Sequence, residues 1–136
     1  MATVILVRHG RSTANVSGTL AGRLPDVHLD EVGIEQAARV GARIAAVPLA
    51  GLVTSPLERC RETARAIGRA HPRSPRTRTD RGLLECDYGE WQGRALKELA
   101  KEKLWKSVQG QPSRVGFPGG EMLPPRPLCA VKESMR

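Results

Sequence analysis

The hydrophobic pattern of the first half of the chain is typical of a parallel α/β protein. Residues 3–7 form a continuous apolar run rich in β-branched residues, which predicts a buried strand. Glycine and proline mark a long loop over 8–29, and small apolar residues at helical spacing predict a helix over 31–46. A second short strand is expected at 52–54.

Capping residues sharpen the expected helix boundaries. Asp30 is a suitable N-cap for the helix over 31–46. Ser55 and Glu58 have the spacing of a capping box, and Pro56 suits the first helical position. Together these residues predict a second helix that runs to about Ala70.

The second half of the chain is less regular. A third strand is expected over 76–80, followed by a loop over 81–94 and a helix over 95–108. Residues 122–136 contain three prolines and no periodicity, and they are expected to be unstructured. The order of elements predicts an α/β fold in which helices cover a parallel sheet.

Composition limits the core and the cellular setting. The 136 residues suit one domain, and because only 3% of them are aromatic, the core is expected to consist of Ala, Val, Leu and Ile. The three cysteines form no CxxC pair and fit neither a zinc site nor a disulfide framework. We therefore expect no metal, free thiols and a cytoplasmic location, with no membrane-spanning segment.

The formal net charge of +8 leaves three partner classes open. It is compatible with nucleic acid, with an anionic small substrate, or with a merely solvated basic surface. The arginines are scattered rather than clustered, and few aromatic residues are present to stack on bases. A nucleic-acid-binding protein is thus the weakest alternative, and no nucleic-acid partner is expected.

Candidate chemistry begins directly behind the apolar run 3–7, with Arg8 and His9. Open α/β sheets bind ligands outside the carboxyl ends of their strands, and a histidine placed there can attack phosphorus through an unprotonated ring nitrogen. Arg59 near a helix start, together with Asn15, could hold the negative oxygens of a phosphoryl group, and Glu85 could protonate the leaving group. Each residue taken alone is more often structural or a solvated charge, but their joint occurrence favours phosphate chemistry.

These segments resemble the histidine phosphatase (phosphoglycerate mutase-like) superfamily. The resemblance covers residues 3–121 in the family's order. It rests on RHGRSTAN at 8–15, LDEVGIEQA at 29–37, TSPLERCRETA at 54–64, LECDYGEWQG at 84–93 and FPGGE at 117–121.

The resemblance implies a role for each candidate residue. His9 would be the phosphorylated nucleophile and Glu85 the proton donor, while Arg8, Arg59 and Asn15 would bind the phosphoryl group. It implies no metal and no organic cofactor. It also implies a small phosphorylated substrate and a phosphatase or phosphomutase activity.

The family carries a second histidine in a Ser-His-Gly motif, and this chain departs from that pattern. His28 and His71 lack the surrounding motif, so neither inherits the role. Beyond Glu121 the resemblance ends. We therefore expect an incomplete domain over 1–121 that lacks the last strand and helices, with a non-homologous tail over 122–136, produced by a truncation or frameshift. Two alternatives remain open, a working phosphatase or phosphomutase and a non-catalytic phosphate-binding remnant. The sequence does not indicate an oligomeric state.

Overall fold

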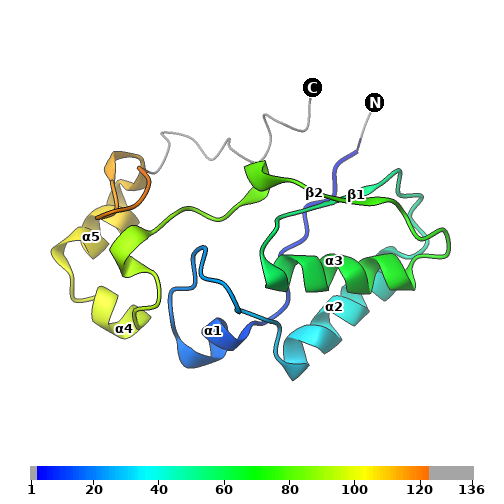
Figure 1. Ribbon diagram of the computed structural model, residues 1–136, viewed down its shortest axis with the longest axis horizontal. Helices are drawn as coiled ribbons and strands as arrows, with labels where there is room; N and C mark the ends of the chain where they lie inside the picture. The colour runs from blue at the N-terminus through cyan, green and yellow to red at the C-terminus, as the bar shows by residue number, and fades with distance from the viewer. Residues whose placement is uncertain (1–2, 123–136) are drawn as a thin grey trace.

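The computed structural model describes residues 3–122 (Figure 1). The helices are α1 (Thr13–Ser17), α2 (Glu31–Ile44), α3 (Glu58–Ala70), α4 (Leu96–Leu99) and α5 (Lys103–Gly110). The strands are β1 (Leu52–Thr54) and β2 (Thr77–Thr79), and single 3-10 turns are η1 (Arg81–Leu83), η2 (Gly89–Trp91) and η3 (Pro112–Arg114).

A β1–α3–β2 unit contains the two paired strands of the described structure. The two strands pair in parallel, with Leu52 opposite Thr77 and Thr54 opposite Thr79, and α3 connects them. The strands predicted at 52–54 and 76–80 are therefore confirmed. The predicted cap of α2 is confirmed as well, because the Asp30 carboxylate accepts a hydrogen bond from the Gly33 amide at 2.7 Å.

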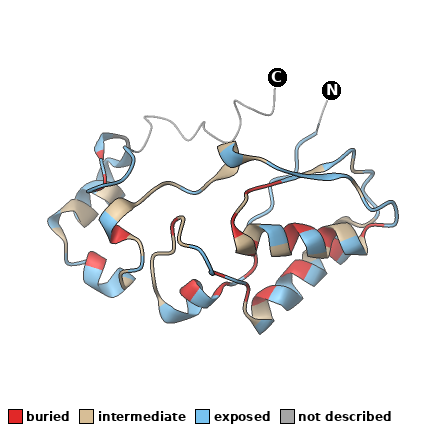
Figure 2. Ribbon diagram, in the orientation of Figure 1, coloured by how far each residue is buried: buried red, intermediate tan, exposed pale blue. Residues whose placement is uncertain are grey.

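Helices α2 and α3 lie side by side, and small residues let them approach closely (Figure 1). A Cβ added at Gly41 would lie 3.0 Å from the Ala70 Cβ and 3.1 Å from the Ala66 carbonyl oxygen. Figure 2 shows buried residues along the two helices. The buried face of α2 therefore consists of Gly33, Ala37 and Gly41, whereas Ile34, which the sequence places on the same stripe, is 57% exposed.

The start of α3 differs from the prediction. The helix begins at Glu58 with Leu57 as its N-cap, and that cap residue makes no side-chain hydrogen bond. The Ser55 hydroxyl accepts a hydrogen bond from the Leu57 amide, at 3.5 Å, and the expected capping box with Glu58 is not formed. Pro56 precedes the helix rather than occupying its first turn, because Leu57, the residue after it, still has an extended conformation.

The expected buried strand at 3–7 is also wrong for the described structure. Residues 3–7 carry no strand pairing, and Val4 and Leu6 are 69% and 78% exposed. A buried parallel strand needs paired strands beside it and cover on both faces. The described sheet contains only β1 and β2, and neither strand pairs with this segment.

The helix predicted over 95–108 is broken into α4 and α5. Leu99 is completely buried, and Trp105 packs against the same core cluster. In one continuous helix these two side chains would point about 120° apart, because each residue turns the helix by about 100°. The break over 100–102 lets both side chains reach the cluster.

That cluster contradicts the expectation of a purely aliphatic core. Trp91, Phe117, Tyr88 and Trp105, which are all the aromatic residues of the chain, gather there. The Tyr88 and Phe117 rings meet edge to face at 4.9 Å, and the two indoles stack at 6.0 Å. Few aromatic residues still make a core when tertiary contacts bring them together, because each buries a large apolar area.

The tail predicted over 122–136 lies outside the described residues except for Met122, which forms an isolated bridge with Gly116. The division into 1–121 and 122–136 therefore stays a prediction. Among residues 3–122, no helix has the length and apolar character needed to cross a bilayer.

Candidate active site

The ring of His9 is fixed by two neighbours of opposite hydrogen-bonding character. Its Nδ1 lies 2.7 Å from the carbonyl oxygen of Gly10, and because a carbonyl only accepts, Nδ1 carries the proton. Its Nε2 lies 3.3 Å from Nε of Arg59, which only donates, so Nε2 is the unprotonated nitrogen. The ring is thus held in the tautomer that a nucleophile at Nε2 requires.

Arg59 projects from the first turn of α3 and is only 3% exposed. Its Nη2 donates to the carbonyl oxygen of Gly22 at 2.8 Å, and its Nε faces His9. Its Nη1 is buried and has no hydrogen-bond partner within the described residues. A buried guanidinium normally satisfies its donors, so one unused Nη1 beside a histidine marks a place for an acceptor.

The loop that carries His9 is tied to α3 through Thr63. The Gly10 amide donates to the Thr63 hydroxyl at 3.2 Å, and that hydroxyl donates to the Arg59 carbonyl oxygen at 2.8 Å. His9 and Arg59 are therefore held by one hydrogen-bonded bridge. Thr63 therefore contributes to the site through its hydroxyl, besides being a residue of α3.

Burial and nearby positive charge favour the neutral form of the His9 ring. Burial is the largest influence and lowers the pKa of His9 below 6.5, and the guanidinium groups of Arg59 and Arg8 lower it further. The Gly10 hydrogen bond and the Glu85 carboxylate raise the pKa but do not reverse the direction. Arg8, Arg59 and Glu85 thus all influence the pKa of His9, and their roles in binding and proton transfer stay predictions.

Asn15 also serves a structural purpose. The loop predicted over 8–29 contains the short helix α1, and Ser12 and Asn15 form a capping box at its start. The Asn15 carboxamide oxygen accepts from the Ser12 amide and from its hydroxyl, both at 3.0 Å. These bonds occupy the carboxamide oxygen. The NH2 group of the same side chain is the donor that an anion would contact.

Glu85 lies in the loop between η1 and η2 and is exposed. Its carboxylate accepts from the Tyr88 hydroxyl at 3.1 Å and from the Cys86 amide at 3.2 Å. Burial is the main cause that raises the pKa of Tyr88, and the Glu85 carboxylate adds to the rise. Tyr88 therefore remains a hydrogen-bond donor that orients the Glu85 carboxylate.

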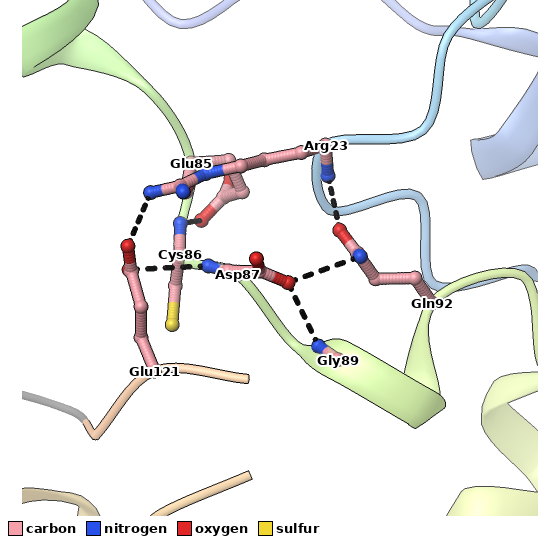
Figure 3. A network of polar contacts seen from close by, with 7 residues as sticks. All are labelled: Arg23, Glu85, Cys86, Asp87, Gly89, Gln92 and Glu121. Atoms are coloured by element: carbon pink, nitrogen blue, oxygen red, sulfur yellow. Dashed lines mark hydrogen bonds and ion pairs between the residues drawn. The ribbon is translucent and has the colours of Figure 1, made fainter. Parts of the chain in front are cut away.

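Sequence reasoning missed Arg23, which contacts the loop that carries Glu85 (Figure 3). Its Nε donates to the Glu85 carbonyl oxygen at 2.6 Å, and its Nη2 donates to the Glu121 carboxylate at 2.7 Å. No local sequence pattern indicates that Arg23 contacts this loop. Among the described residues, no group of three or more His, Cys, Asp and Glu side chains is placed to hold a metal ion.

A pair formed by His28 and Glu62 anchors the long loop to α3. Nδ1 of His28 lies 2.5 Å from Oε1 of Glu62, and the Leu29 amide donates to Oε2 at 2.7 Å. The hydrogen bond to Glu62 raises the pKa of His28 above 6.5.

This pair predicts a pH-dependent stability. Because the folded state raises the pKa of His28, the pair stabilises the protein below pH 6.5, and the stabilisation is lost as pH rises through the raised value. We expect the melting temperature to fall between about pH 6 and about pH 8 by more in the wild type than in His28→Gln. The melting temperatures are measured by circular dichroism. An identical fall in both proteins would contradict this assignment.

Known proteins are similar to this chain in sequence. Residues 4–124 match the sequence profile described as the histidine phosphatase superfamily (branch 1). The chain belongs to this superfamily. Among curated relatives of this histidine phosphatase chain, the 2,3-bisphosphoglycerate-dependent phosphoglycerate mutase 2 of Gloeobacter violaceus is 36% identical over 97% of the chain and 61% of the relative. Fructose-2,6-bisphosphatase TIGAR of Xenopus laevis is 35% identical over 92% of the chain and 46% of the relative.

Solved structures show the same fold. A mycobacterial glucosyl-3-phosphoglycerate phosphatase in complex with VO3 superposes with a TM-score of 0.75 at 26% identity, over 84% of this chain and 54% of that chain. The alpha-ribazole phosphatase of Shigella flexneri superposes with a TM-score of 0.73 at 28% identity, over 85% of this chain and 57% of that chain. The histidine phosphatase chain described here therefore has the α/β fold of these enzymes and spans roughly half of their length.

Proposed function

We propose that this chain forms the phosphate-accepting part of a phosphatase or phosphomutase that works through a phosphohistidine on His9. The observation that carries the proposal is the buried Nη1 of Arg59, which has no partner among the described residues. It belongs to the same guanidinium whose Nε faces the unprotonated Nε2 of His9. A phosphoryl group bound between them would accept from Nη1 and present phosphorus to Nε2.

The proposed reaction has two steps. The Nε2 lone pair of His9 attacks phosphorus, a P–N bond forms, the ester P–O bond breaks, and the leaving alkoxide takes a proton from the Glu85 carboxyl. Water then attacks phosphorus, a P–O bond forms, and the P–N bond breaks and returns its electron pair to Nε2 of His9. The water proton passes to the Glu85 carboxylate, and phosphate leaves. An alcohol in place of water would give a phosphomutase. Arg8 and Arg59 neutralise the equatorial oxygens, and the Asn15 amide donates to one of them.

The proposed substrate is a small phosphorylated molecule. The relatives are named as a phosphoglycerate mutase, a fructose-2,6-bisphosphatase and an adenosylcobalamin/alpha-ribazole phosphatase. These names describe enzymes that act on small phosphate esters. We also assign the chain to the cytoplasm. Cys60 and Cys86 support this location, because both are free thiols, which are typical of a reducing compartment.

Trapping the covalent intermediate tests the proposal. The protein is mixed with a phosphomonoester, quenched in alkali, where phosphohistidine survives, and digested for mass spectrometry. We expect one added phosphoryl group on the peptide that contains His9. Phosphorylation at another residue, or none under conditions in which phosphate is released, would contradict the role of His9.

A specific observation favours a second candidate, phosphate binding without turnover. His28 is paired with Glu62, and the His71 ring is buried with Nε2 2.8 Å from the Val47 carbonyl oxygen. Neither histidine is placed to donate to a phosphoryl group on His9. If this candidate is correct, vanadate raises the melting temperature by mass action, and no phosphohistidine is trapped.

A further inference from the structure

Two neighbouring residues, Gly22 and Arg23, connect the phosphate-binding side of the site to the loop of the proposed acid. We call them the strap. On one side, Nη2 of Arg59 donates to the Gly22 carbonyl oxygen at 2.8 Å. On the other side, Nε of Arg23 donates to the Glu85 carbonyl oxygen at 2.6 Å. The strap therefore contacts both residues that must meet at the phosphoryl group.

The guanidinium of Arg23 makes two contacts with different segments of the chain (Figure 3). Besides Glu85, it contacts Glu121, whose Oε1 accepts from its Nη2 at 2.7 Å. The other oxygen of that carboxylate accepts from the Asp87 amide at 3.2 Å. Arg23 and Glu121 thus hold the loop at two positions, directly at Glu85 and through Glu121 at Asp87.

Further contacts join the loop to its neighbours. The Gln92 carboxamide oxygen accepts from the Arg23 amide at 2.5 Å, and its nitrogen donates to the Asp87 carboxylate at 3.1 Å. The backbone of Gly89 packs so tightly on the segment 118–120 that an added Cβ would lie 2.1 Å from the Pro118 carbonyl oxygen. Contacts of the Arg23 backbone with Gln92 and of Gly89 with the segment 118–120 therefore join the same three segments that the Arg23 side chain contacts.

We propose that Arg23 is a positioning residue that holds the Glu85 loop against the Arg59 side of the site, so that the carboxyl of Glu85 reaches the leaving oxygen. The inference rests on the proposed function for its catalytic consequence. Arginine suits this position because its planar fork presents two donors in fixed directions. Lysine offers a single ammonium group and cannot hold a carbonyl and a carboxylate in that geometry.

The test compares Arg23→Gln with the wild type, with Arg94→Gln as the matched control. Arg94 also makes a 2.7 Å ion pair, with Glu102, but its partner is not in the Glu85 loop. The first measurement is amide hydrogen exchange by NMR in the presence of vanadate. In Arg23→Gln we expect the Asp87 amide to exchange at least about tenfold faster, while Arg94→Gln leaves it unchanged.

The second measurement uses esters with different leaving groups. A nitrophenolate leaves without a proton, whereas an alkoxide requires one, so a misplaced acid slows glycerol phosphate much more than p-nitrophenyl phosphate. We expect Arg23→Gln to lower kcat for the alkyl ester about tenfold more than for the aryl ester, and Arg23→Lys to restore little of the difference. A merely structural residue would lower both equally.

The outcomes separate this inference from the proposed function. Unchanged exchange at Asp87, or an equal loss with both esters, overturns the positioning role of Arg23 even if His9 turns out to be phosphorylated. If the wild type forms no phosphohistidine and turns over neither ester, the proposed function fails. The exchange rate at Asp87 in the vanadate complex then decides alone whether Arg23 holds the loop.

Discussion

Replacing His9 with alanine is expected to lower phosphomonoester turnover by roughly 10⁴-fold or more, because the proposed covalent intermediate forms on its imidazole. The ring is half-buried, and its two hydrogen bonds go to Gly10 and Arg59. Removing it leaves a small space beside the site rather than a hole in the core. The melting temperature should therefore change little while activity disappears.

The measurement is release of p-nitrophenol together with alkaline trapping of the phosphoenzyme. His28→Ala is the matched control, since it removes an imidazole that contacts Glu62 and lies outside the proposed chemistry. Vanadate should still stabilise His9→Ala in part, because Arg59 keeps its unpaired Nη1. Turnover that survives in His9→Ala at the wild-type rate would show that another nucleophile acts.

Local signals in the sequence predicted much of the fold. The strands at 52–54 and 76–80 and the Asp30 cap are set by neighbouring residues, so a short window of sequence contains the information. The exposure of residues 3–7 depends on which segments pack beside them in space. A short window of sequence does not contain that information. The break between α4 and α5 has a similar cause, because Leu99 and Trp105 both contact one distant cluster.

The residues of the candidate site also differ in whether a local sequence motif predicts them. His9 and Arg59 stand in motifs that a reader of the sequence can find, and the structure brings them to 3.3 Å. Arg23 could not be found in this way, because its partners Glu85 and Glu121 are 62 and 98 positions away. The glycine at position 33 was visible in its segment, but its purpose becomes clear only from the backbone that it touches.

Gly33→Ala is expected to destabilise the protein by about 3 kcal/mol and to lower the melting temperature by roughly 10 °C. A Cβ at Gly33 would lie 1.9 Å from the carbonyl oxygen of Arg11. That oxygen belongs to the backbone and cannot rotate away as a side chain could. The first turn of α2 would have to move off the loop that carries His9. Gly10 sits on the other side of the same contact, since its own Cβ would lie 2.3 Å from the Gly33 carbonyl oxygen.

The sign of this effect makes the prediction discriminating. Alanine is normally the better helix former, by about 1 kcal/mol, so a helical glycine with open space around it should gain stability when replaced. Gly110 is such a position, because an added Cβ there meets nothing within 4 Å, and Gly110→Ala should be neutral or stabilising. Urea unfolding of the two variants compares them directly. We expect only Gly33→Ala to lower the free energy of unfolding. We also expect this variant to lose the stabilisation by vanadate, because the displaced loop carries His9 away from Arg59. Equal stability of Gly33→Ala and the wild type would mean that α2 does not rest on the backbone of the His9 loop.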